Sequence, residues 1–273
     1  LENNELGWLI GMLMESYEKG VVTREQLDGL DLRWGNVDAV RSLMHKVAHR
    51  QGIGDVAAEG VMRAAQAIGG EAVNFAIHTA KGNTPRGHDH RGRWTEMFDT
   101  ATSNTGTMET GPMVNMPAPA LQAIGIEDPP DMFSAEEISA FSARSKGAML
   151  FEDSLGVCRF NTNTHLPLLT DAVNAATGWD MDVAEAMRVG QRATNLLRAF
   201  NIRHGIDPGL DLPSRRYGST PLDGPVTGVS IQPAWEDMLA TYYDLLGWDE
   251  RGIPTRETLE ELGIGHVADD LGV

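Results

Sequence analysis

Residues 182–204, DVAEAMRVGQRATNLLRAFNIRH, form the longest stretch of the chain with a helical pattern. Apolar and small residues recur in it at intervals of three and four, which is the period of one helix face. This predicted face comprises Val183, Ala186, Met187, Gly190, Ala193, Leu197 and Phe200. Asp182 is a good N-cap, because its carboxylate can accept hydrogen bonds from the free N–H groups of the first turn. The stretch therefore predicts one long helix with an apolar face.

The rest of the chain is dominated by the same period. We expect helices over Leu6–Tyr17, after the capping box at Thr23, from Asn36 to Gly52, from Val56 to Ile68 with Asp55 as cap, from Ser134 to about Glu152, from Pro167 to Gly178, over Trp235–Leu246 and over Pro254–Leu262. Residues 75–79 alternate like a short strand. Residues 81–131 are rich in Gly and Pro, which predicts an ordered loop region without long regular elements. The predicted fold class is all-α, multihelical, with two helical domains and long loops.

The composition excludes several classes of function. With 22 basic and 39 acidic residues the formal net charge is −17, which repels nucleic-acid backbones and anionic membranes. A single cysteine argues against a disulfide framework and suits a reducing compartment. No apolar run approaches the ~20 residues that cross a bilayer, and no signal peptide is visible. We expect a cytoplasmic protein that binds neither nucleic acid nor membranes.

That single cysteine, Cys158, ends the hexapeptide Asp153-Ser154-Leu155-Gly156-Val157-Cys158. One thiolate cannot hold a metal ion or cluster alone. From these residues by themselves, either Cys158 is an ordinary buried thiol or its partner ligands lie outside this chain.

The hexapeptide resembles the Asp-x-x-Gly-Leu-Cys segment of the aldehyde:ferredoxin oxidoreductase family, tungsten enzymes with a bis-pterin cofactor and a four-iron cluster. Other motifs match in the same order: Gly52-Ile53-Gly54-Asp55 with Ala58-Glu59-Gly60, Lys81-Gly82, Ala101-Thr102-Ser103-Asn104 with Gly106, Asn201-Ile202-Arg203 with Gly205, Asp211-Leu212-Pro213 with Arg215, and Gly247-Trp248-Asp249-Glu250 before Gly252-Ile253-Pro254-Thr255. The resemblance runs nearly end to end. It implies two helical domains, 1–84 as the end of the family's second domain and 85–273 as its third. Family enzymes begin upstream with a β-rich domain and three more cluster cysteines, so we expect this chain to be a fragment of a longer enzyme.

The resemblance also implies roles for individual residues. Cys158 would be the fourth thiolate ligand of a [4Fe-4S] cluster, and Asp153 and Gly156 would bind one pterin through its N–H edge and through backbone. The matching segment for the second pterin includes Asn4 and Gly7, with Asn4 and Leu9 in place of the family's two aspartates. Asn offers a single acceptor oxygen, so this contact is weaker or altered.

The loop from Lys81 to Arg91 carries cations, histidines and Asp89. Read alone, its His-Asp-His sequence indicates either a metal site or a solvated polar loop. By resemblance, Asp89 and Arg91 line the cofactor or substrate cavity, and Lys81 or Arg91 pairs with pterin phosphates.

By the same resemblance, Glu109 stands where the family commonly has a histidine near tungsten. A buried glutamate beside a metal centre would have a raised pKa and could accept a proton, so we predict Glu109 as the catalytic group.

Two functions of different classes follow. In the first, the chain is the C-terminal portion of a tungsten- or molybdenum-pterin, iron–sulfur oxidoreductase. The intact enzyme would convert an aldehyde or related substrate to a carboxylic acid and pass electrons to ferredoxin or a similar acceptor. Both cofactors are expected only in the intact enzyme, together with the missing N-terminal domain, and a second copy in a homodimer is a further candidate partner. In the alternative, the chain is a non-catalytic helical binding or subunit-interface domain that has lost the redox site. Asn4, Leu9, Glu109 and the missing cysteines favour that alternative.

Overall fold

The computed structural model describes residues 1–273, and the side chains of all of them except Pro112 and Pro208. The chain divides into two compact units: residues 1–89 with 212–219 form the first, and residues 90–211 with 220–273 form the second. The described residues form helices and no strand, with isolated bridges only at Thr79–Pro213 and Trp248–Pro254. The expected all-α fold is confirmed. The family-domain boundary at residues 84 and 85 stays a prediction.

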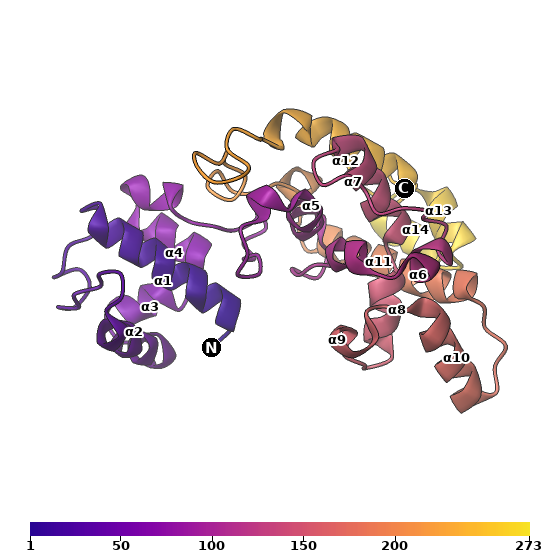
Figure 1. Cartoon of the computed structure of the whole chain (residues 1–273), viewed down its shortest axis with the longest axis horizontal. Coiled ribbons are helices and arrows are strands. Elements are labelled where there is room, and N and C mark those ends of the chain that lie inside the picture. Colours follow the sequence, from indigo (N-terminus) through magenta and orange to yellow (C-terminus); the bar gives the residue numbers. More distant parts are fainter. The chain divides into compact units, whose positions relative to one another are not determined.

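The first unit is built on four α-helices and one 3₁₀ helix (Figure 1). They are α1 (Asn3–Glu18), α2 (Val37–His49), α3 (Ile53–Ala57), α4 (Val61–Ile68) and η1 (Gly70–Asn74). Leu9 and Leu13 of α1 pack with Leu43 of α2 and Val61 of α4, all at most 2% exposed. Asn36 caps α2 through Ala39 N–H, as the sequence predicts.

The second unit contains the other helices. They are η2 (His90–Gly92), α5 (Trp94–Thr102), η3 (Gly111–Asn115), α6 (Ala118–Gln122), α7 (Ala135–Ser145), α8 (Ala148–Ser154), α9 (Arg159–Thr162), α10 (Leu166–Thr177), α11 (Val183–Arg203), η4 (Pro208–Leu210), η5 (Gln232–Ala234), α12 (Trp235–Leu245), α13 (Arg256–Glu261) and α14 (His266–Leu271). α7 packs along α12, and α8 packs along α11. The predicted starts of α10 and α11 and the predicted α12 and α13 are confirmed, whereas α14 was not predicted.

The buried face of α11 agrees with the predicted one at Ala186, Met187 and Gly190, but differs from it in the second half of the helix. Phe200 is 59% exposed, whereas the polar residues Thr194, Asn195 and Arg198 are at most 3% exposed. Two of the three have a buried polar partner outside the helix: Arg198 pairs with Asp211 at 2.9 Å, and Asn195 Oδ1 accepts from Trp248 Nε1 at 2.9 Å. Apolar spacing alone cannot show such pairs, because their partners are distant in sequence.

The single helix predicted from Ser134 to Glu152 is also wrong, because the chain breaks at Lys146 and Gly147 into α7 and α8. Lys146 leaves the helical conformation with ψ 126°, and Gly147 has φ 109°. A Cβ on Gly190 of α11 would lie 1.8 Å from the Gly147 carbonyl oxygen. The two backbones therefore touch directly, which only glycine at position 190 permits.

In the first unit the predicted helix from Val56 to Ile68 is divided at Gly60, whose φ is 88°. Asp55 does not cap it; instead the Glu5 carboxylate of α1 accepts a hydrogen bond from Val61 N–H and caps α4. A Cβ on Gly60 would lie 2.6 Å from Glu5 Oε1, so glycine gives this carboxylate access.

Two further local predictions are wrong. The Thr23 capping box forms its reciprocal hydrogen bonds with Gln26, but the chain remains a turn because Asp28 and Gly29 both take positive φ. Residues 75–79 form no strand, since their pairing with Pro213 is limited to one bridge and proline has no N–H to extend it.

Candidate functional site

Three ionisable side chains, Asp99, Glu109 and Lys146, meet in the interior of the second unit, and each is at most 1% exposed. The Lys146 ammonium lies 2.8 Å from Glu109 Oε2 and 3.4 Å from Asp99 Oδ1. The Tyr242 ring lies beside it, with its centroid 5.6 Å from Lys146 Nζ. Buried charges are stable only where partners compensate for lost hydration, so the three groups depend on one another.

Glu109 orders the loop between α5 and η3. Its Oε1 accepts hydrogen bonds from the backbone N–H groups of Asn104 and Thr105, both at 2.9 Å, and from the Ser103 hydroxyl at 3.1 Å. The Glu109 carboxylate, near the end of the loop, is thus hydrogen-bonded to residues 103–105 at the start of the loop. Because Oε2 lies against Lys146, both oxygens of Glu109 face partners from the protein.

Asp99 holds the other end of the same loop. From α5, its Oδ2 accepts three hydrogen bonds of 2.7 Å from the backbone N–H groups of residues 109–111. Lys146 reaches both carboxylates because the chain leaves the helix at that residue, so the break between α7 and α8 is what delivers the ammonium. The long-range pairing of residues 99, 109 and 146 could not be predicted from local pattern.

The electrostatics of Glu109 are opposite to our expectation. Burial acts to raise the pKa of Glu109, but the charge and hydrogen bonding of Lys146 and the Thr105 contacts outweigh it, and the pKa lies below its ordinary value. The predicted raised pKa is therefore wrong. Burial also raises the pKa of Tyr242 to about 12, so its hydroxyl stays protonated. Glu109 is therefore an anion paired with the Lys146 ammonium. A carboxylate with a lowered pKa is a poor proton acceptor near neutral pH.

The segment that contains Cys158 lies on the surface of the second unit. Cys158 is exposed and directly precedes α9, and Gly156 takes φ 68° after the end of α8. Asp153 pairs with Arg159, whose Nη2 lies 2.6 Å from Oδ2, and Arg159 Nη1 donates to the Met108 carbonyl at 2.7 Å. Arg159 thus connects this segment to the loop that ends at Glu109. Sequence reasoning missed Arg159, although an arginine next to Cys158 was a visible signal.

The remaining predicted residues lie in the first unit, except Arg91, which is half-buried in η2. Asn4 and Gly7 lie in the first turns of α1, and Asp89 is exposed. Lys81 lines a pocket of about 330 Å³ together with Glu5, Arg63 and Gly82. Glu5, next to Asn4, accepts hydrogen bonds from Val61 N–H at the start of α4 and from the Thr84 hydroxyl, the latter at 2.9 Å.

His90, from the sequence that could indicate a metal site, is 1% exposed and has its Nε2 3.2 Å from Glu96 Oε2. Burial acts to raise the pKa of Glu96, but hydrogen bonds from His90 and Arg93 lower it to about 2. The pair fixes the start of α5, so His90 at least is not solvated, and a metal site at the His-Asp-His sequence stays a prediction.

Comparison with known proteins assigns the family. Residues 1–264 match the family profile described as aldehyde ferredoxin oxidoreductase, domains 2 and 3. The chain belongs to this family. Among curated relatives, the tungsten-containing aldehyde ferredoxin oxidoreductases of Pyrococcus furiosus and Thermococcus kodakarensis are each 32% identical over 97% of this chain and 43% of their own length. An aliphatic sulfonate oxidoreductase, WOR-like subunit, of P. furiosus is 31% identical over 98% of this chain and 41% of its own length. The chain thus spans less than half of these relatives.

A solved structure shows the same fold at lower identity. The active site complex BamBC of benzoyl coenzyme A reductase, in complex with 1,5-dienoyl-CoA, matches with a TM-score of 0.74 and 22% identity, over 98% of this chain and 45% of that one. At this identity the likeness concerns the fold alone. No helix among the described residues is long and apolar enough to cross a membrane.

Whether an aldehyde ferredoxin oxidoreductase cofactor fits can be tested on buried polar atoms. Asn104 is 8% exposed, and within the described residues neither its amide nitrogen nor its amide oxygen has a hydrogen-bond partner. Glu152, next to Asp153, is fully buried, and its Oε2 accepts a hydrogen bond from the Thr164 hydroxyl. Its Oε1 has no hydrogen-bond partner among the described residues. Buried polar atoms in native proteins nearly always have partners, so these atoms suit a polar ligand absent from the chain. The residues fit a hydrogen-bonding group such as a pterin.

Proposed function

We propose that this chain is the helical part of a tungsten- or molybdenum-pterin, iron–sulfur oxidoreductase that converts an aldehyde or related substrate to a carboxylic acid in the cytoplasm. The observation that supports this best is the match along residues 1–264 to the family's second and third domains, with Asp153, Gly156 and Cys158 retained. The electron acceptor we propose is ferredoxin or a similar protein. When bound, the metal–pterin group supplies the two-electron redox chemistry, and the cluster passes the electrons on singly.

The chain's own residues would bind and orient these groups. Cys158 would supply one cluster thiolate, and its exposure leaves the sulfur accessible to a cluster completed by ligands outside this chain. Asp153 would accept hydrogen bonds from a pterin edge, for which Arg159 would have to share or release the carboxylate. Asn4, Gly7, Lys81, Asp89 and Arg91 stay predicted cofactor contacts.

In this proposal Glu109 is a positioning residue and not the catalytic group that the sequence predicted. Its pairing with Lys146 supports a positioning role, in which it fixes the loop that carries Asn104. The alternative function, a helical interface domain without redox chemistry, is favoured by the same ion pair, because the carboxylate already has its partners within the fold.

Metal content distinguishes the two functions. The full-length protein that contains this chain should be purified anaerobically and measured for tungsten, molybdenum, pterin, iron and sulfide, and for aldehyde-dependent reduction of a viologen dye. We expect stoichiometric tungsten or molybdenum and about four irons. Cys158→Ser should lose most of the iron and sulfide, whereas Ser154→Ala in the same segment should keep both. If the intact protein contains no metal, pterin or iron, the redox function is rejected and the interface function is supported.

A further inference from the structure

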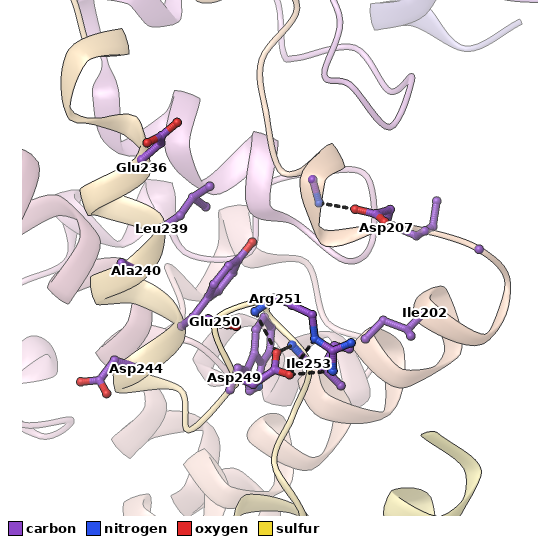
Figure 2. Close-up of a pocket in the computed structure, with 15 residues that line it drawn as sticks. Ile202, Asp207, Glu236, Leu239, Ala240, Asp244, Asp249, Glu250, Arg251 and Ile253 are labelled. Atoms are coloured by element: carbon purple, nitrogen blue, oxygen red, sulfur yellow. Dashed lines mark hydrogen bonds and ion pairs between the residues drawn. The ribbon is translucent and has the colours of Figure 1, made fainter. Parts of the chain in front are cut away.

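A groove of about 800 Å³ lies in the second unit, and its lining includes none of Asp99, Glu109, Lys146, Asp153 and Cys158. It is formed by the end of α11, the loop that follows it, one side of α12 and the turn at residues 248–253. Figure 2 shows Glu236, Leu239 and Ala240 in order along α12, with Ile202 and Asp207 across from them. Two of the motifs quoted above contribute to its lining, Ile202 with Gly205 and residues 248–250 with Ile253, although the sequence alone did not indicate a groove there.

The floor of the groove is apolar and already fixed. Tyr243 and Trp248 are each 5% exposed at its base. The Tyr243 hydroxyl donates to Asp211 at 2.7 Å, and the Arg198 guanidinium lies 4.8 Å from the Trp248 ring centroid. Leu239 and Ile253 add half-buried aliphatic surface. Because these side chains have partners in the fold, the base needs no rearrangement to receive a ligand.

The rim is strongly acidic. Its carboxylates come from three parts of the chain: Asp207 from the loop after α11, Glu236 and Asp244 from α12, and Asp249 and Glu250 from the turn that follows α12. Among the described residues of the lining the one cation is Arg251, which donates to Asp249 through Nε at 3.1 Å and Nη2 at 2.9 Å. Asp249 and Arg251 therefore neutralise each other, and the other carboxylates give the groove a net negative charge. Phosphates, nucleotides and acidic peptides are repelled from such a surface.

We propose that this groove binds a basic, amphipathic segment of a partner polypeptide, in which lysine or arginine side chains flank an apolar residue. An exposed ion pair contributes only ~0.2–1 kcal/mol, so one small cation gains too little to be held. Several cations on one segment can form several such ion pairs, and their free energies add. An apolar side chain between the cations can pack on the apolar floor, which is how amphipathic segments bind in apolar grooves.

Isothermal titration calorimetry of the 273-residue chain tests the proposal. The probe is the acetylated, amidated peptide Lys-Leu-Leu-Lys-Leu, compared with Glu-Leu-Leu-Glu-Leu and Lys-Ser-Ser-Lys-Ser. We expect one site for the first peptide and at least tenfold weaker binding of the other two. Glu236→Gln with Glu250→Gln should weaken the first peptide about tenfold, since two exposed pairs are lost.

The control carries the same change in net charge away from the groove: Asp171→Asn in α10 with Asp180→Asn after its end, both exposed. It should bind the first peptide within about twofold of the unmodified chain. Equal weakening in both double variants would mean non-specific attraction to an acidic protein and would overturn the proposal. Displacement of the peptide by an equal concentration of spermidine would assign the groove to small polyamines and overturn it as well.

Discussion

Replacing Lys146 with methionine keeps the approximate volume of the side chain and removes its charge. Asp99 and Glu109 would then remain buried with no cation within reach of Glu109 Oε2. Asp99 keeps three backbone N–H donors, whereas Glu109 has lost its ion pair, so we expect Glu109 to take up a proton in the folded state. The ordinary pKa of glutamate is about 4.3, so pH 7 lies about 2.7 units above it. At about 1.36 kcal/mol per unit, keeping the carboxyl protonated at pH 7 costs ~3.7 kcal/mol. That agrees with the ~3–5 kcal/mol measured when one partner of a buried pair is removed.

The pH dependence separates this mechanism from a loss of packing. In Lys146→Met the folded-state pKa of Glu109 is raised, so the folded state binds one proton more than the unfolded state and becomes less stable as pH rises. At pH 5 the same protonation costs only ~1 kcal/mol, so the destabilisation should shrink by about 2.7 kcal/mol from pH 7 to pH 5. Urea unfolding followed by circular dichroism at both pH values measures this difference.

A matched double variant completes the test. Glu109→Gln with Lys146→Met removes both members of the pair, and the glutamine oxygen can still accept from the N–H groups of residues 104 and 105. It should be more stable at pH 7 than Lys146→Met alone and should lack the pH dependence. A loss below ~1 kcal/mol in Lys146→Met, or an equal loss at pH 5 and pH 7, would refute the account of the buried charges.

Two further predictions concern stability. The unmodified chain should lose stability as pH falls from about 4.3 through the lowered folded-state pKa of Glu109, because the stabilisation of a depressed carboxylate is present above its unfolded pKa and is lost on protonation. Glu109→Gln should lack that part of the acid transition in a pH series of urea unfolding curves. Gly190→Ala should destabilise by ~3 kcal/mol or more, since its Cβ would overlap the Gly147 carbonyl, whereas Gly11→Ala in α1, with open space around it, should be neutral or slightly stabilising. Equal melting temperatures for these two variants would contradict the close contact of α8 and α11.

Local signals in the sequence were sufficient for much of the helical fold. Asn36 and Asp182 cap helices where predicted, and Gly178 ends one in the left-handed conformation. In each case the deciding hydrogen bond joins residues three or four apart, so it is visible in a short window. Family membership followed from the order of several weak motifs.

The errors arise where a distant residue decides the local structure. The chain breaks at Gly60 because a carboxylate from α1 caps α4, and at Gly147 because the backbone of α11 lies against it. Arg198 is buried in α11 because Asp211 pairs with it. Likewise, Glu109 was expected to have a raised pKa because its burial could be inferred by resemblance, whereas its pairing with Lys146 could not. Such contacts depend on tertiary structure, which a single sequence does not display.

The backbone contact between Gly147 and Gly190 helps to fix the position of α8 and of the Cys158 segment that follows it. Asp153 follows Gly147 by six residues along α8, which at 1.5 Å per residue is a lever of only ~9 Å. With such a lever, a tilt of 5° about the glycine contact would displace Asp153 by ~0.8 Å, enough to break a hydrogen bond to a ligand. No side chain lies between the two glycines, so there are no rotamers there to take up a change in spacing. A larger residue at either position would therefore shift Asp153 as well as destabilise the fold, so the two glycines fix the position of the helix that leads to Cys158.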